Sequence, residues 1–76
     1  MELRQVVGNE LSAWLGARRT LAVAERRLEE SPDDGVRQAQ VERARSDVRE
    51  ALTVLRAAVH AHGYSLADLQ NELRTQ

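Results

Sequence analysis

The chain has 76 residues, a formal net charge of −1 and no cysteine. This length allows a single domain and is too short to enclose a roomy active site, while the absence of thiols excludes a disulfide framework and a thiolate metal site. The 12 acidic and 11 basic residues are interspersed, which is typical of a solvated surface and not of a binding surface for DNA or an anionic membrane.

The composition also bears on origin and location. All 11 basic residues are arginine, which we interpret as the codon usage of a GC-rich bacterial or phage genome. Arginine selected for bidentate contacts is the physical alternative. No run of about 18 apolar residues is present, so we expect no membrane span. Residues 1–5 lack the charged and apolar regions of a secretory signal, so we expect a cytoplasmic protein.

The first expected helix extends from about residue 2 to residue 30. Its apolar residues form two rows with a seven-residue period, like the a and d positions of a coiled coil. The rows are Val7, Trp14, Leu21 and Leu28, and Leu3, Ala17 and Ala24. Gly8-Asn9 could instead start the helix and leave residues 1–7 loose, because glycine costs a helix about 1 kcal/mol relative to alanine. We prefer the longer helix, since the pairing described below continues past Gly8.

The segment Ser31-Pro32-Asp33-Asp34 predicts a turn at residues 31–34. Ser31 offers a capping hydroxyl, Pro32 cannot continue the first helix, and acidic residues suit the free N–H groups of a new helix. Gly35 leaves open whether the second helix begins at Pro32 or two or three residues later. We place the second helix at about residues 35–62.

Residues of the second helix pair with residues of the first whose numbers sum to 65. The rows of the second helix are Val41, Val48 and Leu55, and Ala44, Ala51 and Ala58. In most layers a large residue faces a small one, as Trp14 faces Ala51, which lets antiparallel helices approach closely. Two layers are exceptions, because Glu10 faces Leu55 and His62 faces Leu3. We expect Glu10 at a rim or paired with an arginine of another chain, where it would fix register or oligomeric state.

A short third helix is expected at about residues 66–74, after Gly63 ends the second helix and Ser65 caps the third. A helix of about nine residues does not hold alone in water, so its leucines must dock. It can cover only one of two apolar flanks at the open end of the hairpin. We prefer the bulkier flank, and the predicted docking residues are Leu11, Leu52, Val59, Leu66, Leu69 and Leu73.

The second flank would then remain exposed at the open end, and such a surface usually marks an interaction site. We predict self-association there, with a dimer favoured, completing a four-helix or larger bundle. A monomer with scattered surface alanine and valine is the alternative. Toward the turn the flanking positions are instead polar or charged, as at Arg18, Arg27, Gln40, Arg45 and Asp47. The residues of the predicted surface are Val6, Ala13, Val54, Ala61 and Glu10.

Catalytic and metal-binding patterns are weak in this chain. His60 and His62 point about 200° apart around a helix, so they cannot chelate one metal ion together. The acids within residues 29–34 cluster at a tight turn, which offers no pocket to shift a pKa. We therefore expect no enzyme, no cofactor and no metal site.

Two short stretches resemble known families. Residues 63–69 resemble the opening of the first helix in many bacterial helix-turn-helix domains, but no recognition helix follows, and Asp68 and Glu72 make the surroundings acidic. We do not expect nucleic-acid binding. Trp14-Leu15-Gly16 is similar to the Trp-x-Gly signature of small secreted helical-hairpin proteins of actinobacteria. That signature lies in the turn between helices, whereas here it lies inside the first helix, so its function is not carried over.

These patterns predict one all-α domain over residues 1–76, a long antiparallel helical hairpin with an alanine-rich coiled-coil seam and a short C-terminal helix. We expect a small non-enzymatic protein–protein interaction module, a self-associating adaptor or regulator with a protein partner that the sequence does not name. The alternative is an accessory or inhibitor protein of a DNA-binding or phage assembly machine.

Overall fold

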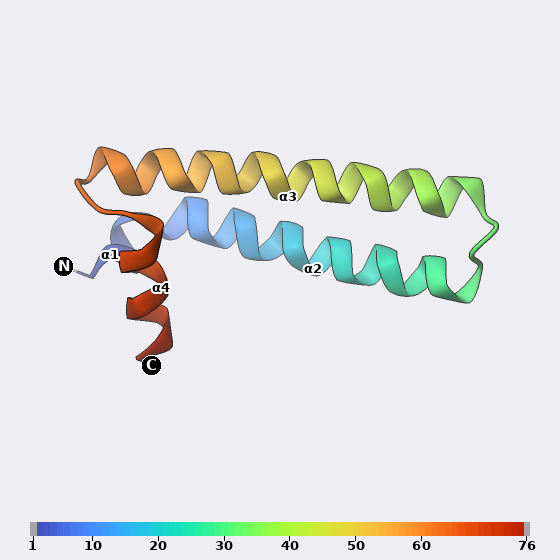
Figure 1. Ribbon diagram of the computed structural model, residues 1–76, viewed down its shortest axis with the longest axis horizontal. Helices are drawn as coiled ribbons and strands as arrows, with labels where there is room; N and C mark the ends of the chain where they lie inside the picture. The colour runs from blue at the N-terminus through green and yellow to red at the C-terminus, as the bar shows by residue number, and fades with distance from the viewer. Residues whose placement is uncertain (1, 76) are drawn as a thin grey trace.

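The computed structural model describes residues 2–75, and all of the regular structure in this range is helical. The elements are α1 (Leu3–Val6), α2 (Gly8–Glu30), α3 (Gly35–Ala61) and α4 (Leu66–Arg74). Helices α2 and α3 run antiparallel as a long hairpin, and the short α4 crosses its open end beside α1 (Figure 1). The predicted all-α hairpin with a short C-terminal helix is confirmed.

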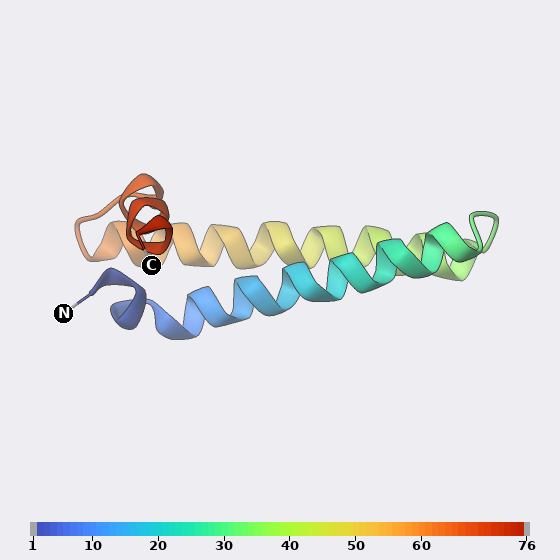
Figure 2. The same ribbon diagram turned by 90° about the horizontal axis from the view of Figure 1, so that it is seen from below.

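The first long segment is interrupted at Val7, so the single helix expected from about residue 2 to residue 30 is wrong in this detail. Val7 has φ −105° and ψ 28°, and it separates the single turn of α1 from α2 (Figure 2). Its side chain is 0% exposed, and Gly8, a weak helix former, follows it. Leu3 is also buried, so the residues before Gly8 are anchored to the core and are not loose.

The turn between α2 and α3 is capped differently from the expectation. Ser31 ends α2, and its N–H donates back into the last turn of that helix at 3.0 Å. Asp34 is the N-cap of α3, and its carboxylate accepts hydrogen bonds from the N–H groups of Val36 (2.9 Å) and Arg37 (3.3 Å). The later of the two starts left open for the second helix is confirmed, since α3 begins at Gly35. Its free N–H groups therefore lie within reach of Asp34, and the expected capping hydroxyl of Ser31 is not used.

Arg37 joins the two long helices at the turn. Its Nη1 donates a hydrogen bond to the carbonyl oxygen of Arg27 in α2 at 2.6 Å, and its Nε lies 3.4 Å from a carboxylate oxygen of Asp34. Gln38 adds a hydrogen bond from its side-chain amide to the carbonyl oxygen of Pro32 at 2.9 Å. The turn end of the hairpin is therefore closed by polar contacts.

Apolar packing between α2 and α3 forms two separate clusters. Near the turn, Ala24, Val41 and Ala44 are buried, and Leu21 and Leu28 pack against them. This cluster contains both members of two expected layers, Ala24 with Val41 and Leu21 with Ala44. The hairpin register in this half therefore follows the heptad rows.

The larger cluster lies at the open end, where α1 and α4 join the hairpin. Its buried residues are Leu3, Val7, Leu11, Leu55, Val59 and Leu69. Between the clusters the seam is thinner, because Ala17, Val48 and Ala51 are only half-buried. The core is therefore strongest at the end that also carries α4.

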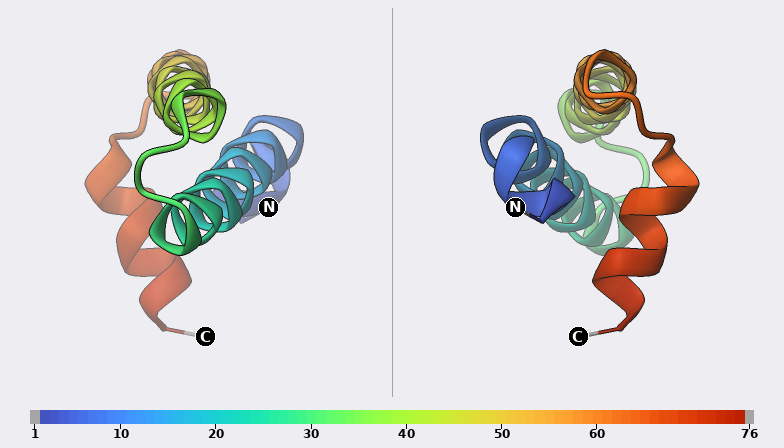
Figure 3. Two further views of the ribbon diagram at one scale, coloured as in Figure 1. Left: turned by 90° about the vertical axis from the view of Figure 1, so that its right-hand side faces the viewer. Right: turned by 90° about the vertical axis from the view of Figure 1, so that its left-hand side faces the viewer.

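A turn at Gly63 ends α3, and a capping box starts α4 two residues later. Gly63 has φ +80°, its N–H donates to the carbonyl oxygen of His60 at 2.9 Å, and the N–H of Tyr64 donates to α3 at 3.1 Å, which is a Schellman ending. Ser65 and Asp68 form a capping box, with hydrogen bonds of 2.8 and 3.3 Å. This short connection brings α4 back onto one side of the hairpin (Figure 3).

Candidate interaction surface

Helix α4 packs against one flank of the hairpin at its open end (Figure 3). Leu69 is 2% exposed and shares the open-end cluster with Leu11 and Val59. Leu66 packs against the same cluster. Four of the six residues predicted for docking are thus brought together.

The other two predicted docking residues contribute less. Leu52 is half-buried, and Leu73 is 37% exposed. Helix α4 crosses the hairpin instead of running along it, so its last turn extends past α2 (Figure 1). Leu73 lies in that last turn, which explains its exposure.

Glu72 binds the beginning of α1, a contact that the sequence pattern does not signal. Its Oε2 accepts a hydrogen bond from the N–H of Leu3 and its Oε1 from the N–H of Arg4, both at 3.0 Å. The Nε of Arg4 lies 3.9 Å from Oε1. A carboxylate suits the unpaired N–H groups at the start of a helix. Glu72 therefore joins the two ends of the chain and holds α4 on its flank.

The flank opposite α4 is the surface for which we predicted self-association. Ala13, Val54 and Ala61 are exposed there, and Val54 is 53% exposed. No helix within residues 2–75 covers this flank at the open end (Figure 3). Val6 behaves differently, since it is half-buried and packs against the open-end cluster. Val6 belongs to α1, which is separated from α2 at Val7, so it does not lie on the continuous face of α2 that carries Ala13.

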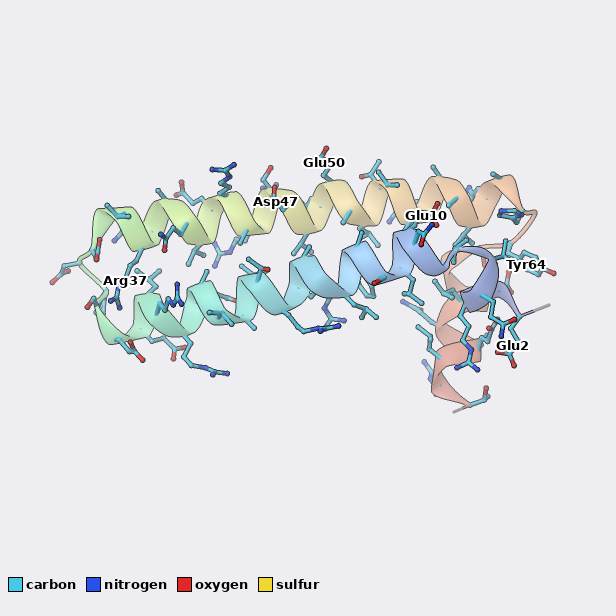
Figure 4. All side chains as sticks on the ribbon, turned by 180° about the vertical axis from the view of Figure 1, so that it is seen from behind. Glu2, Glu10, Arg37, Asp47, Glu50 and Tyr64 are labelled. Atoms are coloured by element: carbon cyan, nitrogen blue, oxygen red, sulfur yellow. The ribbon has the colours of Figure 1, made fainter. Side chains whose placement is uncertain are left out.

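Glu10 lies half-buried on α2. It faces the viewer in Figure 4, which shows the molecule from behind, with α4 on the far side. Its expected neighbour in the seam, Leu55, is 1% exposed. Within residues 2–75, Glu10 takes part in no ion pair. Glu10 is therefore a half-buried carboxylate at the edge of the exposed apolar strip that Ala13, Val54 and Ala61 form.

The same flank continues toward the turn as a groove between α2 and α3, with a volume of about 490 Å³. On α2, Thr20 and Arg27 follow Ala13 at steps of seven residues, and on α3, Asp47 precedes Val54 by seven residues. Seven residues make nearly two helical turns, so residues at this spacing share one side of a helix. The groove, which Thr20, Arg27 and Asp47 line, is therefore the turn-side continuation of the apolar strip.

The groove combines an apolar floor with a basic rim. Val23, Ala24 and Ala44 supply apolar lining, and Val23 is 44% exposed. The charged lining residues are Arg19, Arg27, Arg43 and Asp47. The heptad pattern identified Arg27 and Asp47 only as polar flanking positions. A detectable signal was the spacing of Arg19, Val23 and Arg27 at i, i+4 and i+8, which aligns them on one helical row.

Trp14 packs at the edge of the open-end cluster and is the only tryptophan of the chain. The guanidinium carbon of Arg18 lies 4.8 Å from the centroid of its ring, which is a cation–π contact. Its Nε1 is buried and has no hydrogen-bond partner within residues 2–75. Since the indole is in the seam, its fluorescence reports directly on the packing of the hairpin.

The described part of the chain contains no group of three or more His, Asp or Glu side chains that could hold a metal ion. His60 and His62 are both exposed. None of the helices between residues 2 and 75 combines the length and the apolar character needed to cross a bilayer.

Comparisons with known proteins add no family to this description. Neither protein-family models, nor curated proteins, nor solved structures match the chain. The function is therefore inferred from the exposed flank and its charges.

Proposed function

We propose that the chain is a non-enzymatic helical interaction module that self-associates, with a dimer favoured, through the flank opposite α4. The observation that carries this proposal is the exposed apolar strip formed by Ala13, Val54 and Ala61. Val54 alone leaves 53% of its surface in water on an otherwise strongly charged helix. Burying such a strip is favourable by roughly 25 cal/mol for each Å² of apolar surface removed from water.

The proposed dimer would add apolar contacts to a thin core. Ala17, Val48 and Ala51 remain half-buried in the single chain, so the middle of the hairpin has little apolar bulk of its own. A second hairpin laid against the strip would extend the core and form a four-helix bundle with coiled-coil packing. Alanine at positions 13 and 61 would let helices of the two copies approach closely.

A two-fold dimer would place the strip of one copy on the same strip of the other. Glu10, at the edge of the strip, would then face the second copy. A half-buried carboxylate without an internal ion pair can select an arginine across the interface and fix the register of the bundle. We assign this specificity role to Glu10 as part of the proposal.

Solution mass tests this proposal directly. The wild-type chain should have twice the mass of one chain, which is 8.5 kDa, when measured by light scattering during size-exclusion chromatography. The double variant Val54→Glu/Ala61→Glu should have the mass of a single chain, because it places four carboxylates in the interface of a dimer.

A matched control carries the same two charges on another side of α3. Thr53 and Ala39 are exposed and share a heptad position that points away from the strip, so Thr53→Glu/Ala39→Glu should keep the dimeric mass. A wild-type chain that stays monomeric at all concentrations would refute the proposal. An unchanged mass of the Val54→Glu/Ala61→Glu variant would also refute it.

A further inference from the structure

The groove in the turn half of the flank carries more positive charge than the chain itself neutralises. Arg19, Arg27 and Arg43 line it against one acid, Asp47. None of these three guanidinium groups lies within ion-pair distance of a carboxylate in residues 2–75, whereas Arg4, Arg37 and Arg45 do. Unpaired arginines in a groove favour carboxylate partners, because the guanidinium fork binds them with two parallel hydrogen bonds.

The lining of the groove restricts the shape of a partner. Arg19 and Arg27 are eight residues apart on α2, which is about 12 Å along a helix at 1.5 Å per residue. Val23 lies halfway between them and is 44% exposed. A partner helix parallel to the groove repeats a side chain on one face over the same distance. Acidic residues about two turns apart, with an apolar residue between them, would therefore meet all three positions.

We propose that this groove binds an acidic amphipathic helix of a partner protein, which adds a third helix alongside α2 and α3. Its carboxylates pair with Arg19, Arg27 and Arg43, and its apolar side chains cover Val23 and Ala24. This mode is the helix-in-groove recognition common among helical proteins. The proposed site goes beyond self-association, since it takes a different partner on the other half of the flank.

The apolar floor favours a protein helix over a nucleic acid. A phosphate backbone offers no apolar surface to Val23 and Ala24, which line the groove. The chain as a whole carries a charge of −1, so it lacks the broad positive field that attracts DNA. Charge complementarity is therefore local to the groove.

The experiment uses a fluorescently labelled helical peptide of about 21 residues, long enough to hold a helix, with Glu, Leu and Glu repeated at i, i+4 and i+8 on one face. We expect fluorescence anisotropy to show binding to the full chain, weaker at high salt because exposed charges are screened. Arg27→Glu/Arg43→Glu should weaken binding by about tenfold or more, since it replaces attraction with repulsion. The matched control Arg49→Glu/Arg56→Glu changes two exposed arginines of α3 outside the groove and should bind as wild type.

A charge-inverted peptide with Lys in place of Glu tests whether binding is specific to the groove or non-specific. It should not bind the wild-type chain, and it should bind the Arg27→Glu/Arg43→Glu variant, which also shows that this variant is folded. Equal binding of the acidic peptide to both double variants would overturn the proposal. Binding of a short DNA duplex that depends on Arg27 and Arg43, with no peptide binding, would overturn it in favour of a nucleic-acid site.

Self-association through the strip and helix binding in the groove can be refuted independently. The Val54→Glu/Ala61→Glu variant should bind the acidic peptide as the wild type does, because these substitutions lie outside the groove lining. If Arg27→Glu/Arg43→Glu instead changes the solution mass and the peptide does not bind, the groove is an interface between copies, and the partner-helix proposal is wrong. Loss of dimerisation with retained peptide binding would leave this inference standing.

Discussion

The contact between Glu72 and α1 decides how firmly α4 is held on its flank, and replacing Glu72 with alanine tests it. Glu72→Ala removes two hydrogen bonds of 3.0 Å from backbone N–H groups to a carboxylate, together with the 3.9 Å ion pair to Arg4. Hydrogen bonds to charged groups each contribute about 1.5–3 kcal/mol. The Glu72 side chain is 23% exposed, so water partly compensates, and we expect a loss of about 2 kcal/mol in total.

A loss of about 2 kcal/mol should be visible both globally and locally. A domain of this size loses roughly 4–8 °C of melting temperature per kcal/mol, so Glu72→Ala should melt about 8 °C or more below the wild type. The amide protons of Leu3 and Arg4 should exchange with solvent about thirtyfold faster, as a 1.4 kcal/mol change is tenfold. Glu72→Gln keeps one acceptor oxygen and should show an intermediate effect.

Melting followed by circular dichroism and Trp14 fluorescence, with amide exchange by NMR, provides the assay. All variants are compared at one protein concentration, because self-association stabilises by mass action. Gln70→Ala is the control, since Gln70 is an exposed residue of the same helix. Unchanged exchange at Leu3 and Arg4 in Glu72→Ala would refute the contact. The same result with a lower melting temperature would assign Glu72 a different role in α4.

Three further substitutions test the hairpin, each by thermal melting. Ala51→Leu should cost about 1–3 kcal/mol by overpacking the layer opposite Trp14, and an unchanged melting temperature would contradict the sum-65 register. Asp34→Ala should cost about 1 kcal/mol of stability, because it removes the 2.9 and 3.3 Å hydrogen bonds of the cap. Asp33→Ala, at the exposed position beside it, should leave the melting temperature unchanged. Equal effects of the two substitutions would exclude Asp34 as the cap. Gly63→Ala should cost about 1 kcal/mol, because φ is +80° there and a side chain is strained in that region, and a stabilised variant would refute the Schellman ending.

The hairpin could be predicted because its causes are short-range and periodic. Seven-residue rows in two segments define facing stripes, and Pro32 interrupts the first helix near the midpoint of the pairing. The structure places Ala24, Val41, Leu21 and Ala44 in one cluster, as that pairing requires. The cap of α4 by Ser65 was readable for the same reason, since the two residues of a capping box are only three positions apart.

Competition between neighbouring groups limited the local predictions. At the turn, Ser31 and Asp34 are both good capping residues, and the position of the first free N–H groups selects Asp34. At the other end, the heptad pattern runs through Val7, and only Gly8-Asn9 signalled a second helix start. At the break, α1 contacts α4 through the hydrogen bonds of Glu72 to Leu3 and Arg4, and these contacts are not local in sequence.

The sequence alone determined the antiparallel hairpin, the short third helix and the existence of two apolar flanks at the open end, because each follows from spacing along one or two helices. Only the tertiary structure decided which flank α4 occupies and which stays exposed. The deciding contacts join residues 68 and 69 positions apart, as Glu72 does with Arg4 and Leu3, and no periodicity encodes such a pair. The groove lined by Arg19, Arg27 and Arg43 likewise exists only once α2 and α3 are placed side by side, since its lining comes from both helices.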